Sequence, residues 1–117
     1  MTRNSGPVSW IKAAKKDFGK FPKSAREDML RALELAAEGS KADIAKPTQG
    51  LRSGVFEIAL KYRSDAFRTI YVLQFGQTVW VVHAFQKKST RGIKTPKREI
   101  DLIRERIRRL KEVLKDG

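Results

Sequence analysis

The sequence predicts one α+β domain, in which an antiparallel sheet packs against an N-terminal helical hairpin and is followed by a C-terminal helix. Three features predict this class: apolar residues recur at helical spacing before residue 40, alternate with polar residues between residues 55 and 87, and return to helical spacing after residue 95. The length of 117 residues matches the common size of one domain, so we expect residues 1–117 to form a single domain.

The first forty residues are expected to form the helical hairpin. Residues 8–11 fit either an edge strand or the first turn of a helix. Residues 13–18 continue as a helix, and a second helix is expected to start at Ser24, because Ser24 and Glu27 have the spacing of a capping box. Gly39 supplies its C-terminal stop, and its apolar residues recur every three or four positions: Met29, Leu30, Leu33, Ala36 and Ala37.

Three strands are expected after a loop over residues 40–54. The first covers residues 55–63, where alternation puts Phe56, Ile58, Leu60 and Tyr62 on one face and Glu57, Lys61 and Arg63 on the other. Residues 67–75 and 78–87 are rich in aromatic and β-branched residues and are joined to their neighbours by short turns. This pattern predicts an antiparallel meander.

Strand alternation also predicts which side chains share a face. On the middle strand, Arg68 and Tyr71 are expected on opposite faces unless a bulge intervenes. The third strand is expected to carry five residues on one face: Val79, Val81, His83, Phe85 and Lys87.

The chain is expected to end in a long helix. Thr95 can cap this helix, with Pro96 at its first position. An apolar stripe along it could pack on the sheet or on a partner, and consists of Ile100, Ile103, Ile107, Leu110 and Leu114. The other faces of the helix are densely charged.

The charge balance predicts a polyanionic partner. The chain has 26 Lys and Arg against 13 Asp and Glu, a net charge of +13. Residues 87–111 alone hold 11 basic and 3 acidic residues. Such a run also fits the solvated face of a helix, but the excess over the whole chain favours nucleic acid. A membrane surface is a weaker alternative, because the aromatic residues lie mostly in the expected strands.

Composition excludes several other classes of site and location. The chain has no Cys and one His, which excludes disulfides and thiolate chemistry and argues against a structural zinc site. No apolar stretch is long enough to span a bilayer, and the N-terminus does not resemble a secretory signal. We therefore expect a cytoplasmic protein. No acidic cluster suited to Mg²⁺ and no Gly-rich phosphate loop is present, so we expect no metal and no cofactor.

Three strand residues are candidates for catalysis of RNA cleavage: Arg68, His83 and Lys87. Cleavage through the ribose 2′-OH needs a base, cations for the developing charge on phosphate, and an acid for the leaving oxygen, and these residue types supply all three. His83 fits the role of base or acid, although a lone His in an apolar strand also fits a hydrogen-bonded core residue. Arg68 is a fork for phosphate or, alternatively, a salt-bridge partner of Glu57.

Further candidates would hold RNA without reacting with it. Phe85 could stack on a base or belong to the core. The basic candidates for contact with the RNA backbone are Arg63, Lys88, Arg91, Lys94 and Lys97.

Several segments carry a family resemblance. They are Phe56-Glu57-Ile58, Phe67-Arg68-Thr69-Ile70-Tyr71, Val82-His83-Ala84-Phe85-Gln86-Lys87-Lys88 and Thr95-Pro96-Lys97-Arg98-Glu99-Ile100, with Trp10, Lys15-Lys16-Asp17 and Phe21-Pro22 upstream. In order and spacing they resemble the HigB-like branch, of the phage-derived host-inhibition type, of the RelE/ParE toxin superfamily. The resemblance covers most of the chain.

The resemblance implies a RelE-like fold, with a twisted antiparallel sheet backed by two N-terminal helices. It implies a toxin that cuts mRNA on the translating ribosome and is neutralised by a helix-turn-helix antitoxin of the HigA type. By position, it implies that Arg68 contacts the scissile phosphate, that His83 is the base or acid, and that Lys87 and Lys88 hold the RNA backbone.

Two alternatives to an RNA-cleaving toxin stay open. One branch of the superfamily, the ParE-like toxins, inhibits DNA gyrase, so membership of the fold does not settle the target. The positive charge also fits a basic nucleic-acid-binding module without enzymatic activity.

Overall fold

The chain folds as three helices and a five-stranded sheet in a computed structural model that describes residues 7–40, 42–48, 50–76, 78–87 and 95–116. In chain order the elements are β1 (Val8–Trp10), α1 (Lys12–Phe18), α2 (Lys23–Ala37), β2 (Ala45–Pro47), β3 (Val55–Tyr62), β4 (Asp65–Phe75), β5 (Thr78–Lys87) and α3 (Lys97–Asp116). The predicted α+β class and the predicted order of helices and long strands are confirmed.

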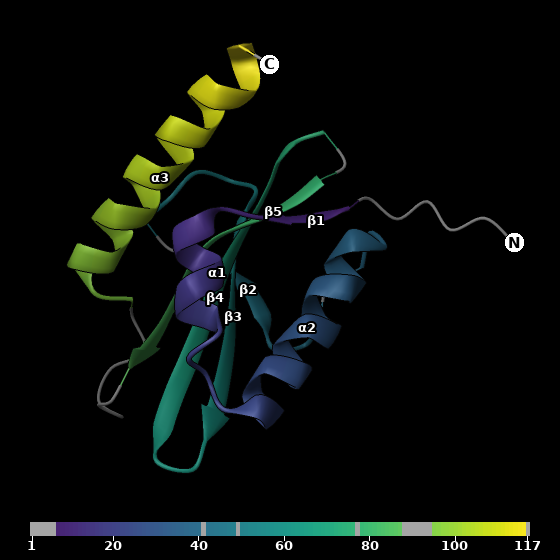
Figure 1. Cartoon of the computed structure of the whole chain (residues 1–117), viewed down its shortest axis with the longest axis vertical. Coiled ribbons are helices and arrows are strands. Elements are labelled where there is room, and N and C mark those ends of the chain that lie inside the picture. The colour runs from purple at the N-terminus through teal and green to yellow at the C-terminus, as the bar shows by residue number, and fades with distance from the viewer. Residues whose placement is uncertain (1–6, 41, 49, 77, 88–94, 117) are drawn as a thin grey trace, which may run out of the picture.

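The sheet has the strand order β1-β5-β4-β3-β2 (Figure 1). Strands β2 to β5 pair antiparallel, which confirms the meander, whereas β1 pairs parallel with β5. For residues 8–11 the sequence left open an edge strand or the first turn of a helix. The structure shows an edge strand over Val8–Trp10. The short strand β2 lies inside the segment expected to be a loop, and it covers the other edge of the sheet.

The second helix starts one residue earlier than the sequence predicts. Helix α2 begins at Lys23, with Pro22 at the N-cap and no side-chain cap hydrogen bond. The predicted capping box of Ser24 and Glu27 is therefore wrong, because Ser24 already lies in the helix. The stop at Gly39 agrees with the structure, since α2 ends at Ala37 and Gly39 has a φ of 89°.

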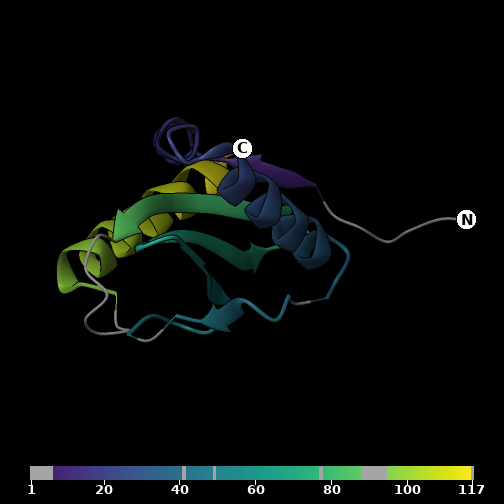
Figure 2. The ribbon, with the colours of Figure 1, turned by 90° about the horizontal axis from the view of Figure 1, so that it is seen from below.

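The helices cover the two faces of the sheet. Helix α1 packs over β5, and α2 packs over β3 and β5. Figure 2 shows these two helices on the same side of the curved sheet, while α3 runs along its margin in Figure 1. The core under α1 and α2 includes Met29, Leu33, Ile58, Phe67 and Tyr71. A second core under α3 includes Val55, Ile70, Val72, Val82 and Ile103.

A bulge in β5 changes the predicted faces. Ile70 pairs with His83 and Tyr71 pairs with Val81, so Val82 is an extra residue in β5. Val79 and Val81 consequently face α1 and α2, whereas Val82 and His83 both face α3. The prediction that His83 shares a face with Val79 and Val81 is wrong. The extra residue of the bulge reverses the alternation of faces after Val81, and the sequence pattern does not show where a bulge occurs.

The apolar stripe of α3 packs on the sheet, which is one of the two alternatives that the sequence left open, the other being a partner. Ile103 is completely buried and Leu110 nearly so, while Leu114 at the far end is partly exposed. None of the helices in the described residues is both long and apolar enough to cross a membrane.

Candidate functional site

The strand register brings four predicted site residues to one face of the sheet, the face that α3 partly covers. Across β3, β4 and β5 the register forms three adjacent rows on this face. They are Glu57-Ile70-His83, Ala59-Arg68-Phe85 and Lys61-Ala66-Lys87. We call this arrangement the three-row face. It places Arg68 beside Phe85 and puts His83 and Lys87 in the rows on either side.

Arg68 forms a buried ion pair within the three-row face. Its Nη1 donates to Glu57 Oε2, and both side chains are largely shielded from solvent. The hydroxyl of Thr95 donates to Glu57 Oε1 at 2.5 Å. The salt bridge that the sequence allowed as an alternative role of Arg68 is therefore present. The prediction of Pro96 at the first position of the last helix is wrong, because α3 begins at Lys97 and Pro96 precedes it.

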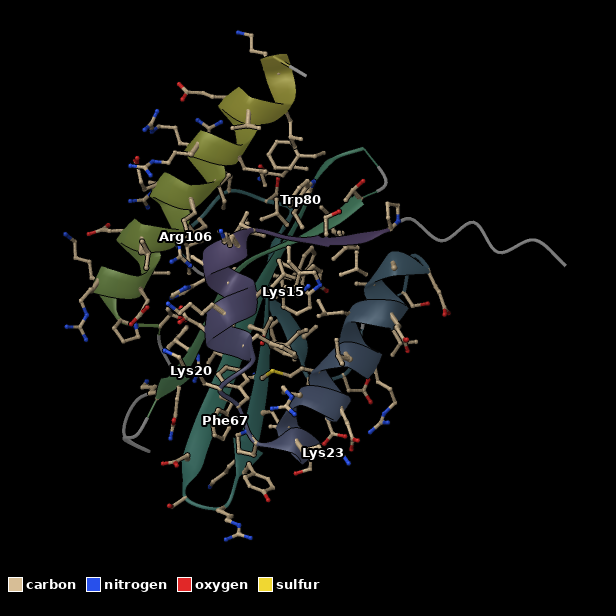
Figure 3. The ribbon with its side chains drawn as sticks, viewed as in Figure 1. Lys15, Lys20, Lys23, Phe67, Trp80 and Arg106 are labelled. Carbon is tan, nitrogen blue, oxygen red and sulfur yellow. The ribbon has the colours of Figure 1, made fainter. Side chains whose placement is uncertain are left out.

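His83 is buried and contacted at both ring nitrogens. Its Nε2 lies 2.5 Å from Glu99 Oε1, and its Nδ1 lies 2.9 Å from Arg106 Nη1. Arg106 also donates to the carbonyl oxygen of Val82 at 3.0 Å. Figure 3 shows Arg106 on the side of α3 that is turned toward α1 and the sheet. The ring of Phe85 stacks on His83, with centroids 5.1 Å apart.

Burial lowers the pKa of His83 below its usual value of 6.5. Glu99 opposes this effect through its hydrogen bond and its charge, the positive charge of Arg106 adds to it, and Asp17 of α1 opposes it. Because burial dominates, the structure favours the neutral imidazole at neutral pH.

The remaining predicted RNA-binding residues lie around this face or outside the described residues. Lys87 is half-buried at the end of β5. Arg63 is exposed in the turn after β3, with a φ of 59°, and its guanidinium lies 5.5 Å from the ring centroid of Tyr62. Lys97 is exposed and pairs with Asp101 at 3.6 Å. The residues outside the described part of the chain are Lys88, Arg91 and Lys94.

Sequence reasoning missed the contribution of α3 to this site. Glu99 and Arg106 stand four residues before and three residues after the buried Ile103, so all three lie on the face of α3 that meets the sheet. In the sequence, Glu99 and Arg106 are charged residues that border the apolar stripe of the helix. This position predicts that their side chains contact polar groups of the sheet.

Tyr71 lies on the opposite face from Arg68, as predicted, and is buried under α1 and α2. It stacks on Phe56 with ring centroids 5.4 Å apart. Tyr71 therefore belongs to the core.

The two tyrosines should titrate separately. Burial raises the pKa of Tyr71 to about 12, whereas hydrogen bonds to Ser24 and Arg63 lower the pKa of Tyr62. We expect absorbance at the phenolate band to rise in two steps, one below pH 10 and one near pH 12. The folded state binds the Tyr71 proton more tightly than the unfolded state does. The neutral phenol therefore makes its full contribution to the free energy of unfolding below pH 10, and this contribution is lost as the pH rises toward 12. The variant Tyr71→Phe should lose the later step alone, and a single step for both tyrosines in the folded protein would contradict the assignment.

One cavity lies elsewhere, between α3 and the segment before β3. It has a volume of about 710 Å³. Leu51, Val55 and Ile107 supply apolar lining, and Arg52 and Arg108 lie among its charged residues. This cavity shares no lining residue with the three-row face.

The three-row face has the groups required for acid–base chemistry on a phosphodiester. It combines an arginine, an imidazole whose pKa is lowered by burial, and two lysines in its last row, Lys61 and Lys87. Guanidinium and ammonium groups stabilise negative charge on phosphate, and an imidazole can accept or donate a proton. Among the described residues, no group of three or more His, Asp or Glu side chains is arranged to hold a metal ion.

The fold is similar to solved structures of RelE toxins. A mutant E. coli RelE toxin in the free state matches with a TM-score of 0.55 at 20% identity, over 68% of this chain and 81% of that chain. The isolated E. coli RelE toxin gives 0.55 at 18% identity, over 76% and 89%. The toxin–antitoxin complex RelBE2 from Mycobacterium tuberculosis gives 0.50 at 18% identity, over 75% and 98%. These similarities establish a RelE-like fold.

Comparison of sequences identifies the family. No curated protein matches the chain in sequence. The model of the family described as Phage derived protein Gp49-like (DUF891) matches residues 16–108. This range includes α2, all of β2 to β5 and more than half of α3, and with it the whole three-row face. The chain therefore belongs to the phage-derived Gp49-like family.

Proposed function

We propose that this protein is the toxin of a type II toxin–antitoxin system and is a HigB-like endonuclease that cleaves mRNA on the ribosome. The observation that carries the proposal is the three-row face, which aligns Arg68, His83 and Lys87 on a basic protein of RelE-like fold. The similar M. tuberculosis structure is a toxin–antitoxin complex, which supports an antitoxin partner. We propose a helix-turn-helix antitoxin of the HigA type and action in the cytoplasm, where mRNA is translated.

The proposed reaction is attack by the ribose 2′-OH on the adjacent phosphorus. The base takes the 2′-OH proton, the 2′ oxygen forms a bond to phosphorus, and the bond to the 5′ oxygen breaks as this oxygen takes up a proton. Arg68 would stabilise the charge that develops on the phosphate, and His83 would exchange a proton. Ribosomal RNA and mRNA together supply the polyanion that a net charge of +13 favours.

The other candidates would position the RNA. Lys87 lies in the row next to that of Arg68, and Arg63 lies beyond this row, in the turn between β3 and β4. We propose that they contact the backbone together with Lys88, Arg91, Lys94 and Lys97, and that Phe85 stacks on a base beside His83.

Mapping of mRNA 5′ ends tests this function. The protein is expressed briefly in cells, and the purified protein is added to a translation system with ribosomes and to the same mRNA without them. We expect new 5′ ends within translated codons, and none without ribosomes. Intact messages during growth arrest would contradict the proposal, and DNA breaks under those conditions would indicate the gyrase alternative.

A binding assay addresses the remaining alternative, a nucleic-acid-binding module without enzymatic activity. Such a module would bind duplex DNA with a slope of about −0.9 per neutralised phosphate in a plot of log affinity against log salt. This binding in the absence of any cleavage, with or without ribosomes, would favour the module over the nuclease.

A further inference from the structure

Helix α3 contacts both ring nitrogens of His83. Glu99 reaches Nε2 at 2.5 Å and Arg106 reaches Nδ1 at 2.9 Å. The His83 side chain is only 4% exposed, while that of Glu99 is 18% exposed. Neither nitrogen is therefore open to a substrate while α3 lies on the sheet in this arrangement.

The partners of His83 decide which nitrogen carries the proton. The guanidinium of Arg106 can only donate hydrogen bonds, so Nδ1 must accept through its lone pair. The proton of a neutral imidazole then sits on Nε2, where it is donated to the carboxylate of Glu99. A second proton on Nδ1 would point at the positive charge of Arg106.

We propose that Arg106 and Glu99 are positioning residues that hold His83 as the neutral imidazole protonated on Nε2, and that proton transfer by His83 requires at least one of these two contacts to open. The first part of this proposal stands on the contacts themselves. The second part rests on the proposed nuclease function.

Opening the two contacts would have different chemical results. If Arg106 moves away, Nδ1 can take the 2′-OH proton as the 2′ oxygen bonds to phosphorus, and the carboxylate of Glu99 then stabilises the imidazolium that forms. A phosphate is an attractive alternative partner for Arg106, because a guanidinium binds an anion more strongly than a neutral ring nitrogen. If the Glu99 contact opens, Nε2 is available as a donor.

Among the described residues, the charged groups that act on the pKa of His83 come from two helices. They are Glu99 and Arg106 of α3 and Asp17 of α1. Since Asp17 is common to all the variants below, differences among them report on α3 alone.

Nitrogen-15 NMR of the imidazole tests the positioning roles directly. His83 is the single His in the chain, so its two ring nitrogens give the only imidazole signals. In the wild-type protein at pH 7 we expect a protonated Nε2 and an unprotonated Nδ1. A protonated Nδ1, or a charged ring at pH 7, would overturn the proposal.

Substitution of Arg106 should change these signals in a defined way. In Arg106→Met the pKa of His83 should rise, because a positive charge is lost and Nδ1 becomes free to take a second proton, while Glu99 still holds the proton of the neutral ring on Nε2. Arg106→Lys, which keeps a donor and a charge, should return the pKa of His83 toward its wild-type value. The matched control is Arg109→Met, because Arg109 lies on the exposed side of α3 and pairs with Glu105 at 3.0 Å. Equal signals in Arg106→Met and Arg109→Met would contradict the role of Arg106.

Glu99→Gln tests the second contact in a nearly isosteric side chain. Its amide oxygen can still accept from Nε2, so the tautomer should persist, while the pKa of His83 should fall because the negative charge is gone. An unchanged pKa would contradict the role of Glu99. If the substitution Arg106→Met disturbs the packing of α3 on the sheet, Glu99→Gln still tests whether α3 positions His83.

The pH profile of mRNA cleavage tests the link to proton transfer. The part of the pH–rate profile that reports the titration of His83 should move to higher pH in Arg106→Met and to lower pH in Glu99→Gln. These shifts should match the changes in pKa measured by NMR. A profile that stays in place while the NMR pKa moves would overturn the link to proton transfer. Absence of cleavage by the wild-type protein would instead contradict the proposed function, and the NMR signals would still decide the positioning roles.

Discussion

Replacement of Arg68 by alanine is expected to lower mRNA cleavage by about 10²–10³-fold, the usual cost of losing one group that stabilises charge in a transition state. Arg68 is the central cation of the three-row face, between the rows of His83 and Lys87. The measurement is the rate of cleavage at a defined codon in the purified translation system. Arg68→Lys should recover part of the rate, because it keeps the charge but not the planar fork.

A loss of activity in Arg68→Ala must be separated from a loss of folding. Removing Arg68 leaves Glu57 largely buried without its cationic partner, which costs on the order of 3–5 kcal/mol for a buried pair. The double variant Glu57→Gln with Arg68→Met removes both charges, so it should regain most of this stability without regaining cleavage. Normal cleavage by the folded double variant would contradict the role of Arg68, and its buried pair with Glu57 would then be structural.

Replacement of Ile103 by alanine is expected to give the largest loss of stability on α3, about 2–5 kcal/mol in the free energy of unfolding. Ile103 is 0% exposed and packs in the second core with Val82, Ile70 and Val72. The loss combines the transfer of its side chain into water with the cavity left beneath the helix. Urea unfolding followed by circular dichroism measures it.

A matched substitution on the same helix provides the control. Val113 is 67% exposed, so Val113→Ala should change the free energy of unfolding by no more than about 0.5 kcal/mol. Similar small effects for both variants would show that α3 does not depend on the second core. Because Glu99 and Arg106 flank Ile103, loosening of α3 should also disturb the NMR signals of His83.

Local patterns in the sequence were sufficient for the long elements of the fold. The helices α2 and α3 and the strands β3 to β5 each span enough residues for a period of 3.6 or 2 to show. The three-residue strands β1 and β2 were missed or left open, because no period is visible in so short a segment. The helix start at Lys23 was misplaced by one residue, because the capping pattern of Ser24 and Glu27 was present without being used.

Part of the candidate site also followed from the sequence. Alternation within β4 put Arg68 opposite Tyr71, and alternation within β3 put Glu57 on the face opposite Phe56 and Ile58, both of which the structure shows. The sequence therefore determined that a basic α+β domain carries an arginine, a histidine and a lysine in adjacent strands. It also allowed the Arg68–Glu57 salt bridge as one of two roles.

Only the tertiary structure decided how these residues meet. The bulge at Val82 turns His83 toward α3, and the docking of α3 brings Glu99 and Arg106 to its two nitrogens. A bulge depends on the pairing of two strands, and the contact between residues 83 and 106 depends on how a helix packs across a sheet. The spacing of neighbouring residues encodes neither the bulge nor the contact of Arg106 with His83. Both depend on packing in the assembled core, where Ile103 and Leu110 are buried.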